Sequence, residues 1–300
     1  MNFESARSFI YRNARPLDLA RWRYLFEDGD RELVLTALAA YQNGDGGFGH
    51  GLEADCWNPE SAPVQTWAAT QILREAGLDD VEHPIVQGIL RYLASGAAFD
   101  GHVWLGTLPS NDAHPHAPWW NYDPEQAWGY NPTASLIGFI LRCAKRESPL
   151  YALAVRLAGE AYSWFRAHAP LESMHTAACF VELYEDLREC APAGVELDEF
   201  EALLRAQLQH VLTRDPDAWA REYVCKPSLF IHDRKSAFYE ENRALCALEC
   251  AFIAETQLAD GSFRVTWDWG CGFEQWAVAK NWWKSDLILK NAQFSRAMEG

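Results

Sequence analysis

The sequence is poor in positive charge. Its 300 residues include 26 Lys and Arg against 42 Asp and Glu, which gives a formal net charge of −16. Binding to nucleic acid requires a Lys/Arg footprint on the phosphates, so we expect no nucleic-acid partner and no broad polyanion-binding face. This net charge does not exclude a small basic pocket for one anionic group. Most of the acidic excess is explained by solubility.

Three other patterns are missing. The N-terminus MNFESARSFIYRNARP has no basic stretch followed by an apolar one, no apolar run is long enough to cross a bilayer, and no cysteines form a CxxC pair. We therefore expect neither a signal peptide nor a membrane span. The eight cysteines are scattered, several of them inside apolar helix patterns. This predicts reduced, mostly buried thiols in a cytoplasmic protein.

Segments that alternate at period two are few and short, such as SFRVTWDW. Apolar residues instead recur at spacings of three and four, the period of an α-helix with one buried face. The pattern predicts an all-α fold with helices over residues 16–26, 31–42, 64–77, 84–95, 132–146, 151–168, 175–190, 197–213, 239–257 and 275–294. No Pro- or Ser-rich linker divides the chain, so we predict one domain over residues 1–300.

One short pattern occurs twice. QNGDGGF at 42–48 matches QLADGSF at 257–263, with Gln, Asp, Gly and Phe in register, and each copy follows an apolar helix. Asp-Gly favours a turn in which glycine takes a positive φ, so the pattern predicts a helix stop. A weaker copy is SGAAFDGHVW at 95–104. Pairs of helices that recur at a period of tens of residues indicate a repeat array.

The glycine-rich stretch GDGGFGHG does not match a known phosphate-binding loop. It follows no strand, and it contains neither GxxxxGK[ST] nor a GxGxxG that opens a helix in a βαβ unit. The turn interpretation is therefore preferred. The longest loop, residues 106–132, is rich in aromatic residues, and a loop of that length is more often functional than not.

These motifs resemble a known group of proteins. DGGFGHG…ESAPVQTWAATQIL resembles the repeat of protein prenyltransferase β-subunits, and Q-x-x-D-G-G/S-F resembles the Gln–Trp repeats of squalene and other terpenoid cyclases. The resemblance implies an (α/α) toroid of five to six helix pairs, with a cavity at the N-terminal ends of the inner helices. It also implies an enzyme that binds a small or isoprenoid-like molecule in a Trp-lined central cavity.

In such a toroid the residues at and before the starts of the inner helices line the cavity mouth. Helix N-termini favour acids and anionic ligands there. The candidate catalytic residues are Glu53, Asp55 and His175. The candidate ligand-binding residues are Trp57, Gln65, Trp119, Trp120, Asn121, Tyr122, Tyr130, Asn131, Trp267, Trp269, Trp283 and Lys284.

Glu53 and Asp55 allow three interpretations. They match two positions of the D-x-D-D acid motif of terpenoid cyclases, in which neighbouring carboxylates hold one proton in place, although Cys56 replaces the last acid. They could also order the turn before Gln65, or bind a polar ligand such as a sugar. The adjacent Asp55–Cys56 pair does not reproduce the D-x-C zinc motif of prenyltransferases. His114-x-His116 alone is a weak metal signal, so we predict neither a metal nor a cofactor.

The aromatic stretches HAPWWNYD and WDWGCGFEQW suit two kinds of ligand. Indole faces stabilise carbocations, and they also stack on sugar rings while nearby amides and acids bind hydroxyl groups. His175, at a helix N-terminus, would suit a neutral base. Asn131, His175 and Tyr239 together would fit a polysaccharide lyase. A carbohydrate-active lyase or hydrolase and a non-catalytic binding protein therefore remain alternatives to the isoprenoid enzyme.

Overall fold

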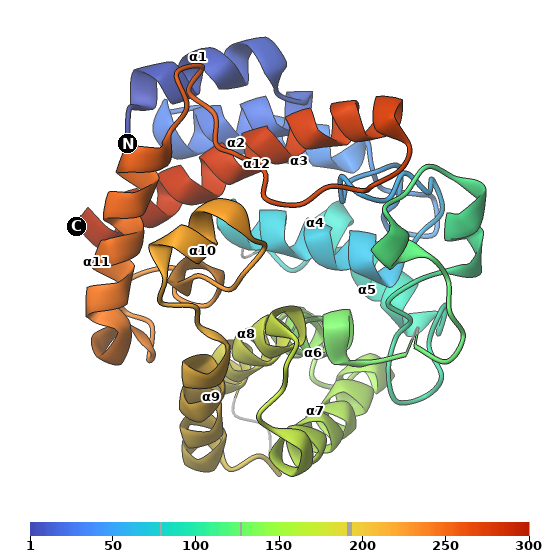
Figure 1. Ribbon diagram of the computed structural model, residues 1–300. Coiled ribbons are helices and arrows are strands. Elements are labelled where there is room, and N and C mark those ends of the chain that lie inside the picture. Colours follow the sequence, from blue (N-terminus) through green and yellow to red (C-terminus); the bar gives the residue numbers. More distant parts are fainter. Residues whose placement is uncertain (79, 127, 191–193, 300) are drawn as a thin grey trace. The chain divides into compact units, whose positions relative to one another are not determined.

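A computed structural model describes residues 1–78, 80–126, 128–190 and 194–299. These residues form twelve α-helices and three short 3₁₀ turns, and within them only isolated β-bridges occur, without a strand. The all-α prediction is confirmed. None of the described helices is both long enough and apolar enough to cross a membrane. The helices are α1 (Phe3–Asn13), α2 (Pro16–Phe26), α3 (Arg31–Ala39), α4 (Pro63–Glu75), α5 (Pro84–Ala94), α6 (Tyr130–Cys143), α7 (Pro149–His168), α8 (Met174–Cys190), α9 (Leu197–Val211), α10 (Pro216–Arg221), α11 (Tyr239–Thr256) and α12 (Phe273–Glu299) (Figure 1).

All ten predicted helices are present, and α1 and α10 are additional. The signal for α1 is a cap: Asn2 Oδ1 accepts a hydrogen bond from the Ser5 N–H (3.0 Å), which satisfies one of the free donors of the first turn. Helix α10 has six residues, too few to display an apolar period, but Asp215 caps it in the same way and Pro216 occupies its first position.

The chain divides into two compact units. Unit 1 comprises Met1–Ala37 and Leu212–Gly300, so it contains both ends of the sequence, and unit 2 comprises Leu38–Val211. The prediction of one domain over residues 1–300 stays a prediction, since a compact unit is not by itself an independently folding domain.

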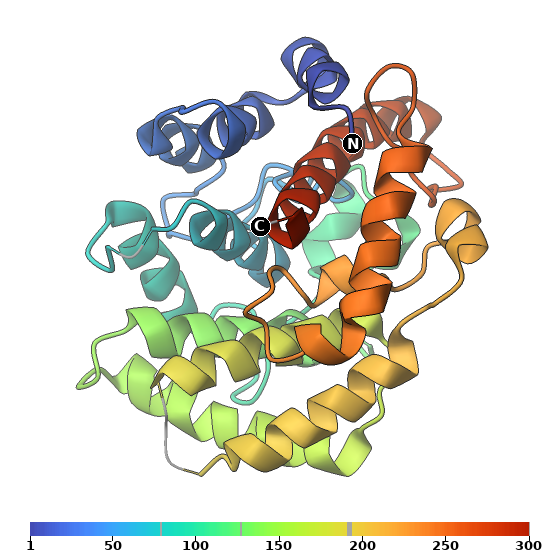
Figure 2. The same ribbon diagram turned by 90° about the vertical axis from the view of Figure 1, so that its left-hand side faces the viewer.

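Unit 2 is organised around α6. Every residue of α6 from Pro132 to Leu141 is buried, as expected for a helix that is apolar on all sides. It packs against α4, α7 and α8, and α9 packs in turn on α7 and α8 (Figure 2). In unit 1, α12 packs against α1, α2 and α11.

The first copy of the repeated turn connects α3 to the helix α5. Gln42 Nε2 donates to the carbonyl of Gly46 (3.0 Å) and to that of Ile85 in the first turn of α5 (3.1 Å). Asp45 Oδ1 accepts from the backbone N–H two residues further on (2.9 Å). Gly46 has a φ of +97° and lies so close to α5 that a Cβ would come within 2.1 Å of the Gly88 oxygen. Only glycine fits here.

The second copy repeats this geometry between α11 and α1. Gln257 Nε2 donates to the carbonyls of Gly261 and Asn2 (3.0 Å each), and Asp260 Oδ1 accepts from the N–H two residues on (2.9 Å). Gly261 has a φ of +89°, and a Cβ there would lie 2.1 Å from the Ser5 oxygen. The two copies therefore share their hydrogen bonds and their contact with a neighbouring helix.

The weaker copy at residues 95–104 keeps the turn and changes the contact. Asp100 Oδ1 accepts from the His102 N–H (2.8 Å), and Gly101 has a φ of +105°. Side chains replace the close backbone approach, because Arg156 of α7 donates to the Gly101 carbonyl (2.9 Å) and His102 Nδ1 lies 2.9 Å from Glu160 Oε2. This turn thus joins α5 to α7.

A threonine in the following helix fixes the aromatic residue after two of these turns. The Phe48 N–H donates to Thr66 Oγ1 in the first turn of α4 (3.1 Å), and the Trp104 N–H donates to Thr133 Oγ1 in the first turn of α6 (2.8 Å). Both rings are fully buried. Each turn therefore sets the position of the helix that follows it.

Candidate functional site

The loop that carries the two predicted acids is tied to the start of α4. The Gln65 side chain is fully buried: its Oε1 accepts from the Glu53 N–H (2.7 Å) and its Nε2 donates to the Cys56 carbonyl (2.7 Å). The Asp55 N–H donates to Glu53 Oε2 (2.9 Å), and Asp55 is only 2% exposed. These bonds order the turn, as one of the three interpretations expects. A catalytic role for either acid stays a prediction.

Two other predicted residues, Trp57 and His175, also lie outside the cavities described below. The Trp57 N–H donates to the Pro115 carbonyl (2.9 Å) and its Nε1 donates to the Ala54 carbonyl (2.9 Å), so Trp57 joins the loop to the segment before the aromatic residues. His175 is exposed on the first turn of α8, and the next residue, Thr176, is the one that lines a cavity.

The first cavity lies in unit 2 and has a volume of about 300 Å³. Four aromatic residues line it: Trp119, Trp120, Trp128 and Tyr130. All of them except Trp128 were predicted from the sequence. Its polar lining includes Thr107, Gln126, Asn131 and Thr176. Because Tyr130 and Asn131 begin α6 and Thr176 lies in the first turn of α8, the cavity is located at the N-terminal ends of these two helices.

The Trp residues at this cavity are presented by the short turn Pro118–Trp120. Trp120 packs on the apolar cluster of Ala62, Val64, Leu105 and Leu108, and Asn111 Nδ2 donates to the Trp120 carbonyl (3.0 Å). Trp120 Nε1 is buried without a hydrogen-bond partner among the described residues. Trp119 is 47% exposed, so its indole is accessible to a ligand.

The two residues that follow this turn have structural contacts. Asn121 Oδ1 lies 2.7 Å from His116 Nε2, so its amide holds the histidine of the H-x-H pair. The Tyr122 ring packs against the same apolar cluster as Trp120. A direct contact between ligand and either residue stays a prediction.

A row of polar side chains on α8 leads away from this cavity. Thr176, Cys179 and Glu182 follow at intervals of three residues, so they lie on neighbouring turns of one side of the helix. The Cys179 thiol donates to Asn131 Oδ1 (3.6 Å), which joins the row to the cavity lining. Glu182 lies six residues from Thr176, about 9 Å along the helix axis.

Glu182 is an acid in unusual surroundings, and it was not predicted from the sequence. Gln71 Nε2 (2.9 Å) and Trp67 Nε1 (3.3 Å) both donate to its Oε2 from α4. Burial raises the pKa of Glu182, and the nearby donors and the Arg74 charge offset this only in part. Its side chain keeps some access to solvent. The sequence signal was weak, because FVELYEDL is an ordinary amphipathic pattern whose partners lie more than a hundred residues away.

An ion cluster follows one turn beyond Glu182. Asp186 is buried and accepts from Arg74 (2.8 and 3.0 Å) and from Arg142 (3.3 Å). A Cβ at position 138 of α6 would lie 2.4 Å from Asp186 Oδ2, so Gly138 makes room for the carboxylate. The three helices α4, α6 and α8 thus meet along one polar seam.

The remaining predicted residues belong to unit 1. Trp267 and Lys284 line a second cavity of about 530 Å³. Trp283 packs edge-on against Trp267, with ring centroids 5.2 Å apart at 79°. Trp269 is only 3% exposed and packs against Trp276. The predicted ligand residues that line a cavity are therefore divided between two cavities, one in each unit.

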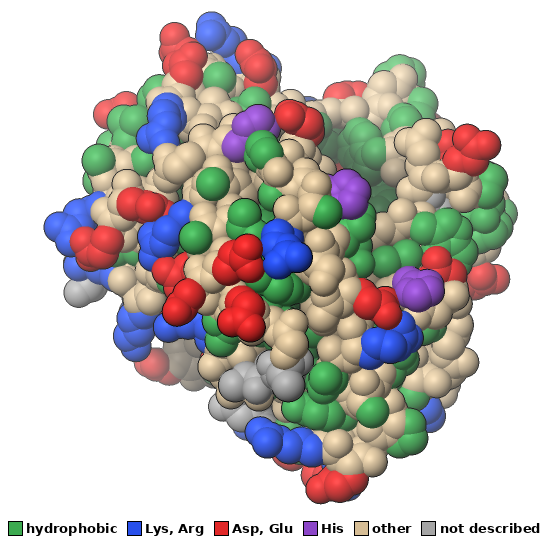
Figure 3. Space-filling view, turned by 90° about the horizontal axis from the view of Figure 1, so that it is seen from below, with side chains coloured by type: hydrophobic (Ala, Val, Ile, Leu, Met, Phe, Trp, Pro, Cys, Tyr) green, Lys and Arg blue, Asp and Glu red, His purple; other side chains and the backbone are tan. Residues whose placement is uncertain are grey.

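Among the described residues, no three His, Cys, Asp or Glu side chains gather as the ligands of a metal ion would. On the face seen in Figure 3, acidic and basic side chains lie interspersed. No protein-family model matches the chain, and neither a curated protein nor a solved structure matches it.

Proposed function

We propose that the chain is built on the repeat of an (α/α) toroid. In such a fold inner helices contact one another and outer helices do the same. Unit 2 supports this, since α4 contacts α6, α6 contacts α8, and α7 contacts α9. Two of the repeated turns add a rule: each follows one helix and contacts the second helix after it, from α3 to α5 and from α5 to α7.

The third turn extends the rule to the ends of the chain. It follows α11 and contacts α1, so α1 takes the place of the second helix after α11, with α12 between them. A closed ring requires this, because its last helix must be followed by its first. The contact of α12 with α1 inside unit 1 supports the same proposal.

We further propose that the cavity of unit 2 binds a small ligand of the carbohydrate class. The observation that carries this proposal is the lining of the cavity, which combines four aromatic side chains with amide and hydroxyl groups. Sugar rings stack on indoles while amides and hydroxyls bind their hydroxyl groups. Trp119 and Trp128 would supply exposed faces, and Asn131, Gln126 and Thr176 would supply the polar contacts.

An isoprenoid-like ligand is the alternative that the sequence resemblance favours. A hydrocarbon chain requires a lining with few unsatisfied polar groups, because burying an amide without a partner is unfavourable. Gln126 Nε2 donates to Asp123 and Asn131 Oδ1 accepts from Cys179, so the other polar atom of each amide would be the one that binds a sugar hydroxyl.

Glu182 is the residue proposed for catalysis. An acid whose pKa is raised keeps its proton nearer neutrality, as the general acid of a glycoside hydrolase must. Glu182 does not line the cavity, so its proton would reach the leaving oxygen through a bridging water as the glycosidic C–O bond breaks. A second water would add to the sugar carbon, and the proton that this water loses would return to Glu182. Cys179 and Asn131 would connect this acid to the cavity.

Calorimetric titration with a panel of neutral mono- and disaccharides tests the binding proposal. Replacing Trp119 or Trp128 by Ala should weaken binding about tenfold each, because one ring stack is lost. Phe273→Ala is the matched control, since that ring is 76% exposed and lines neither cavity. Binding of farnesol but of no saccharide, or equal binding by all three variants, would contradict the proposal.

A second experiment separates catalysis from binding. Glu182→Gln keeps the shape of the side chain and an oxygen for Trp67 and Gln71, but removes the proton donor. We expect saccharide binding to persist and hydrolysis of a nitrophenyl glycoside to fall by at least a hundredfold, the range of general acid catalysis. An unchanged rate would remove Glu182 from the mechanism and leave a binding protein.

A further inference from the structure

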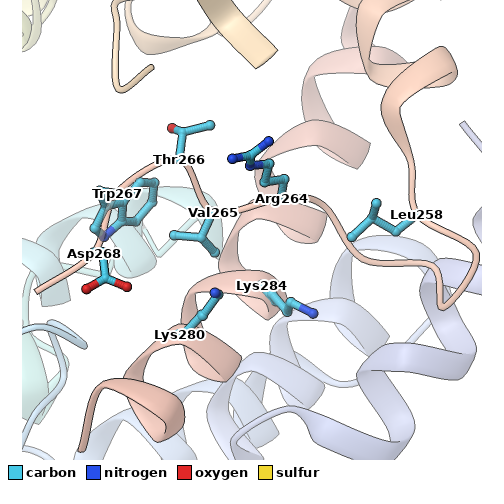
Figure 4. Close-up of a pocket in the computed structure, with 8 residues that line it drawn as sticks. All are labelled: Leu258, Arg264, Val265, Thr266, Trp267, Asp268, Lys280 and Lys284. Atoms are coloured by element: carbon cyan, nitrogen blue, oxygen red, sulfur yellow. The ribbon is translucent and has the colours of Figure 1, made fainter. Parts of the chain in front are cut away.

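The second cavity, in unit 1, has a charge opposite to that of the chain. Figure 4 shows its two sides: Lys280 and Lys284 stand on α12, and residues 264–268 form the segment opposite. Its lining contains three cations, Arg264, Lys280 and Lys284, and one carboxylate, Asp268, which leaves a local charge of +2 (3 − 1). The whole chain carries −16.

In the described part of the chain, only one of these cations, Lys284, is paired with a carboxylate of the protein. Lys284 Nζ lies 3.6 Å from Asp260 Oδ2, at the long end of ion-pair distance. Among the described residues, no Asp or Glu lies within ion-pair distance of Arg264 or Lys280. Lys280 is half-buried, and its Nζ lies 5.9 Å from the centre of the Trp276 ring.

The spacing of the two lysines adds a repulsion that Asp260 offsets at Lys284 but not at Lys280. Residues four apart lie on one face of a helix, and like charges there repel each other. Arg264 adds a third positive charge from the opposite segment; its side chain extends away from α12 in Figure 4, so it must turn toward the lysines to share an anion with them. A dianion bound among the three would remove this repulsion, and the planar guanidinium of Arg264 is suited to two parallel hydrogen bonds with it.

An aromatic ring with a fixed orientation lies beside the cations. Trp267 is half-buried and packs edge-on against Trp283 (5.2 Å, 79°) and at a tilt against Tyr223 (4.9 Å, 60°). Two such contacts hold the indole in one orientation, while part of it still lines the cavity. A volume of about 530 Å³ is enough for a ring in addition to an anionic group.

We propose that this cavity binds a phosphorylated small molecule. Its phosphate dianion lies among Arg264, Lys280 and Lys284, and its ring lies against Trp267. The proposal is independent of the saccharide site, because it concerns other residues in the other unit.

Calorimetric titration of the full chain with inorganic phosphate and with phenyl phosphate tests both parts. Phenyl phosphate should bind at least tenfold more tightly than inorganic phosphate, because its ring adds the contact with Trp267. Trp267→Leu should abolish this difference while it leaves phosphate binding within twofold. An equal affinity of the two ligands for the original protein would refute the ring contact.

Charge variants test the phosphate part. Arg264→Gln and Lys280→Gln should each weaken phenyl phosphate binding at least tenfold. Lys235→Gln is the control, because Lys235 is an exposed residue of unit 1 that does not line the cavity, and it removes the same charge. An equal loss in the control would show a non-specific charge effect and overturn the proposal. So would benzoate binding as tightly as phenyl phosphate, since a monocarboxylate would then suffice.

Discussion

Gly46→Ala is the sharpest test of the repeated turn. The residue has a φ of +97°, a region in which alanine is less stable than glycine by about 1 kcal/mol. A Cβ would in addition lie 2.1 Å from the Gly88 oxygen of α5, so the turn and the helix must separate. Overpacking of this kind destabilises by about 1–3 kcal/mol. We expect a total loss of about 3 kcal/mol in the free energy of unfolding.

Gly101→Ala is the matched control. Its φ of +105° is almost the same, but no atom lies within 4 Å of a Cβ there. Only the backbone contribution should remain, about 1 kcal/mol. Thermal unfolding followed by circular dichroism should lower the Tm by about 2–4 °C for Gly101→Ala and by roughly three times as much for Gly46→Ala. Equal losses would refute the argument that contact with α5 requires the glycine.

Three further predictions concern single ionisable side chains. Burial raises the pKa of Glu249, whose carboxylate accepts hydrogen bonds from the N–H and hydroxyl of Ser228 (2.8 and 2.6 Å). The free energy of unfolding should therefore fall as the pH rises from about 5 through the raised pKa. Glu249→Gln should reduce the slope of Tm plotted against pH. An unchanged slope would assign the effect to other groups. Cys271 is the exposed cysteine, so Ellman's reagent should modify one thiol rapidly, and Cys271→Ser should remove that phase; a rapid phase left in the variant would contradict it. Asp186→Asn should lower stability by about 3 kcal/mol in urea unfolding, since Arg74 loses its buried partner, and a loss under 1 kcal/mol would show that solvent replaces the pair.

The helices and the turns were accessible from the sequence because both depend on neighbours along the chain. A period of 3.6 residues is set by residues within one helix, so all ten expected helices are present. The Asp-Gly turns are equally local, since Asp45 and Asp260 accept from N–H groups two residues on. Cysteine burial also followed from apolar surroundings, and burial raises the pKa of Cys56 to about 12.

The candidate site was predicted only in part, and the reason is again distance along the chain. Trp119, Trp120, Tyr130 and Asn131 could be proposed because they stand at a helix start and in an aromatic loop. Gln65 likewise lies in the first turn of a helix, yet the backbone of residues 53 and 56 uses its whole amide. The periodicity of a helix does not show which of its polar residues meets a neighbouring loop.

By itself, the sequence determined an all-α chain, its helix boundaries within a few residues and its repeated helix stops. The tertiary structure alone decided that Trp267 and Lys284 line a different cavity from Trp119 and Trp120. It also decided that Trp67 and Glu182, 115 positions apart, share a hydrogen bond. The physical reason is that local patterns fix the conformation of each segment, whereas a cavity depends on which faces of distant segments meet.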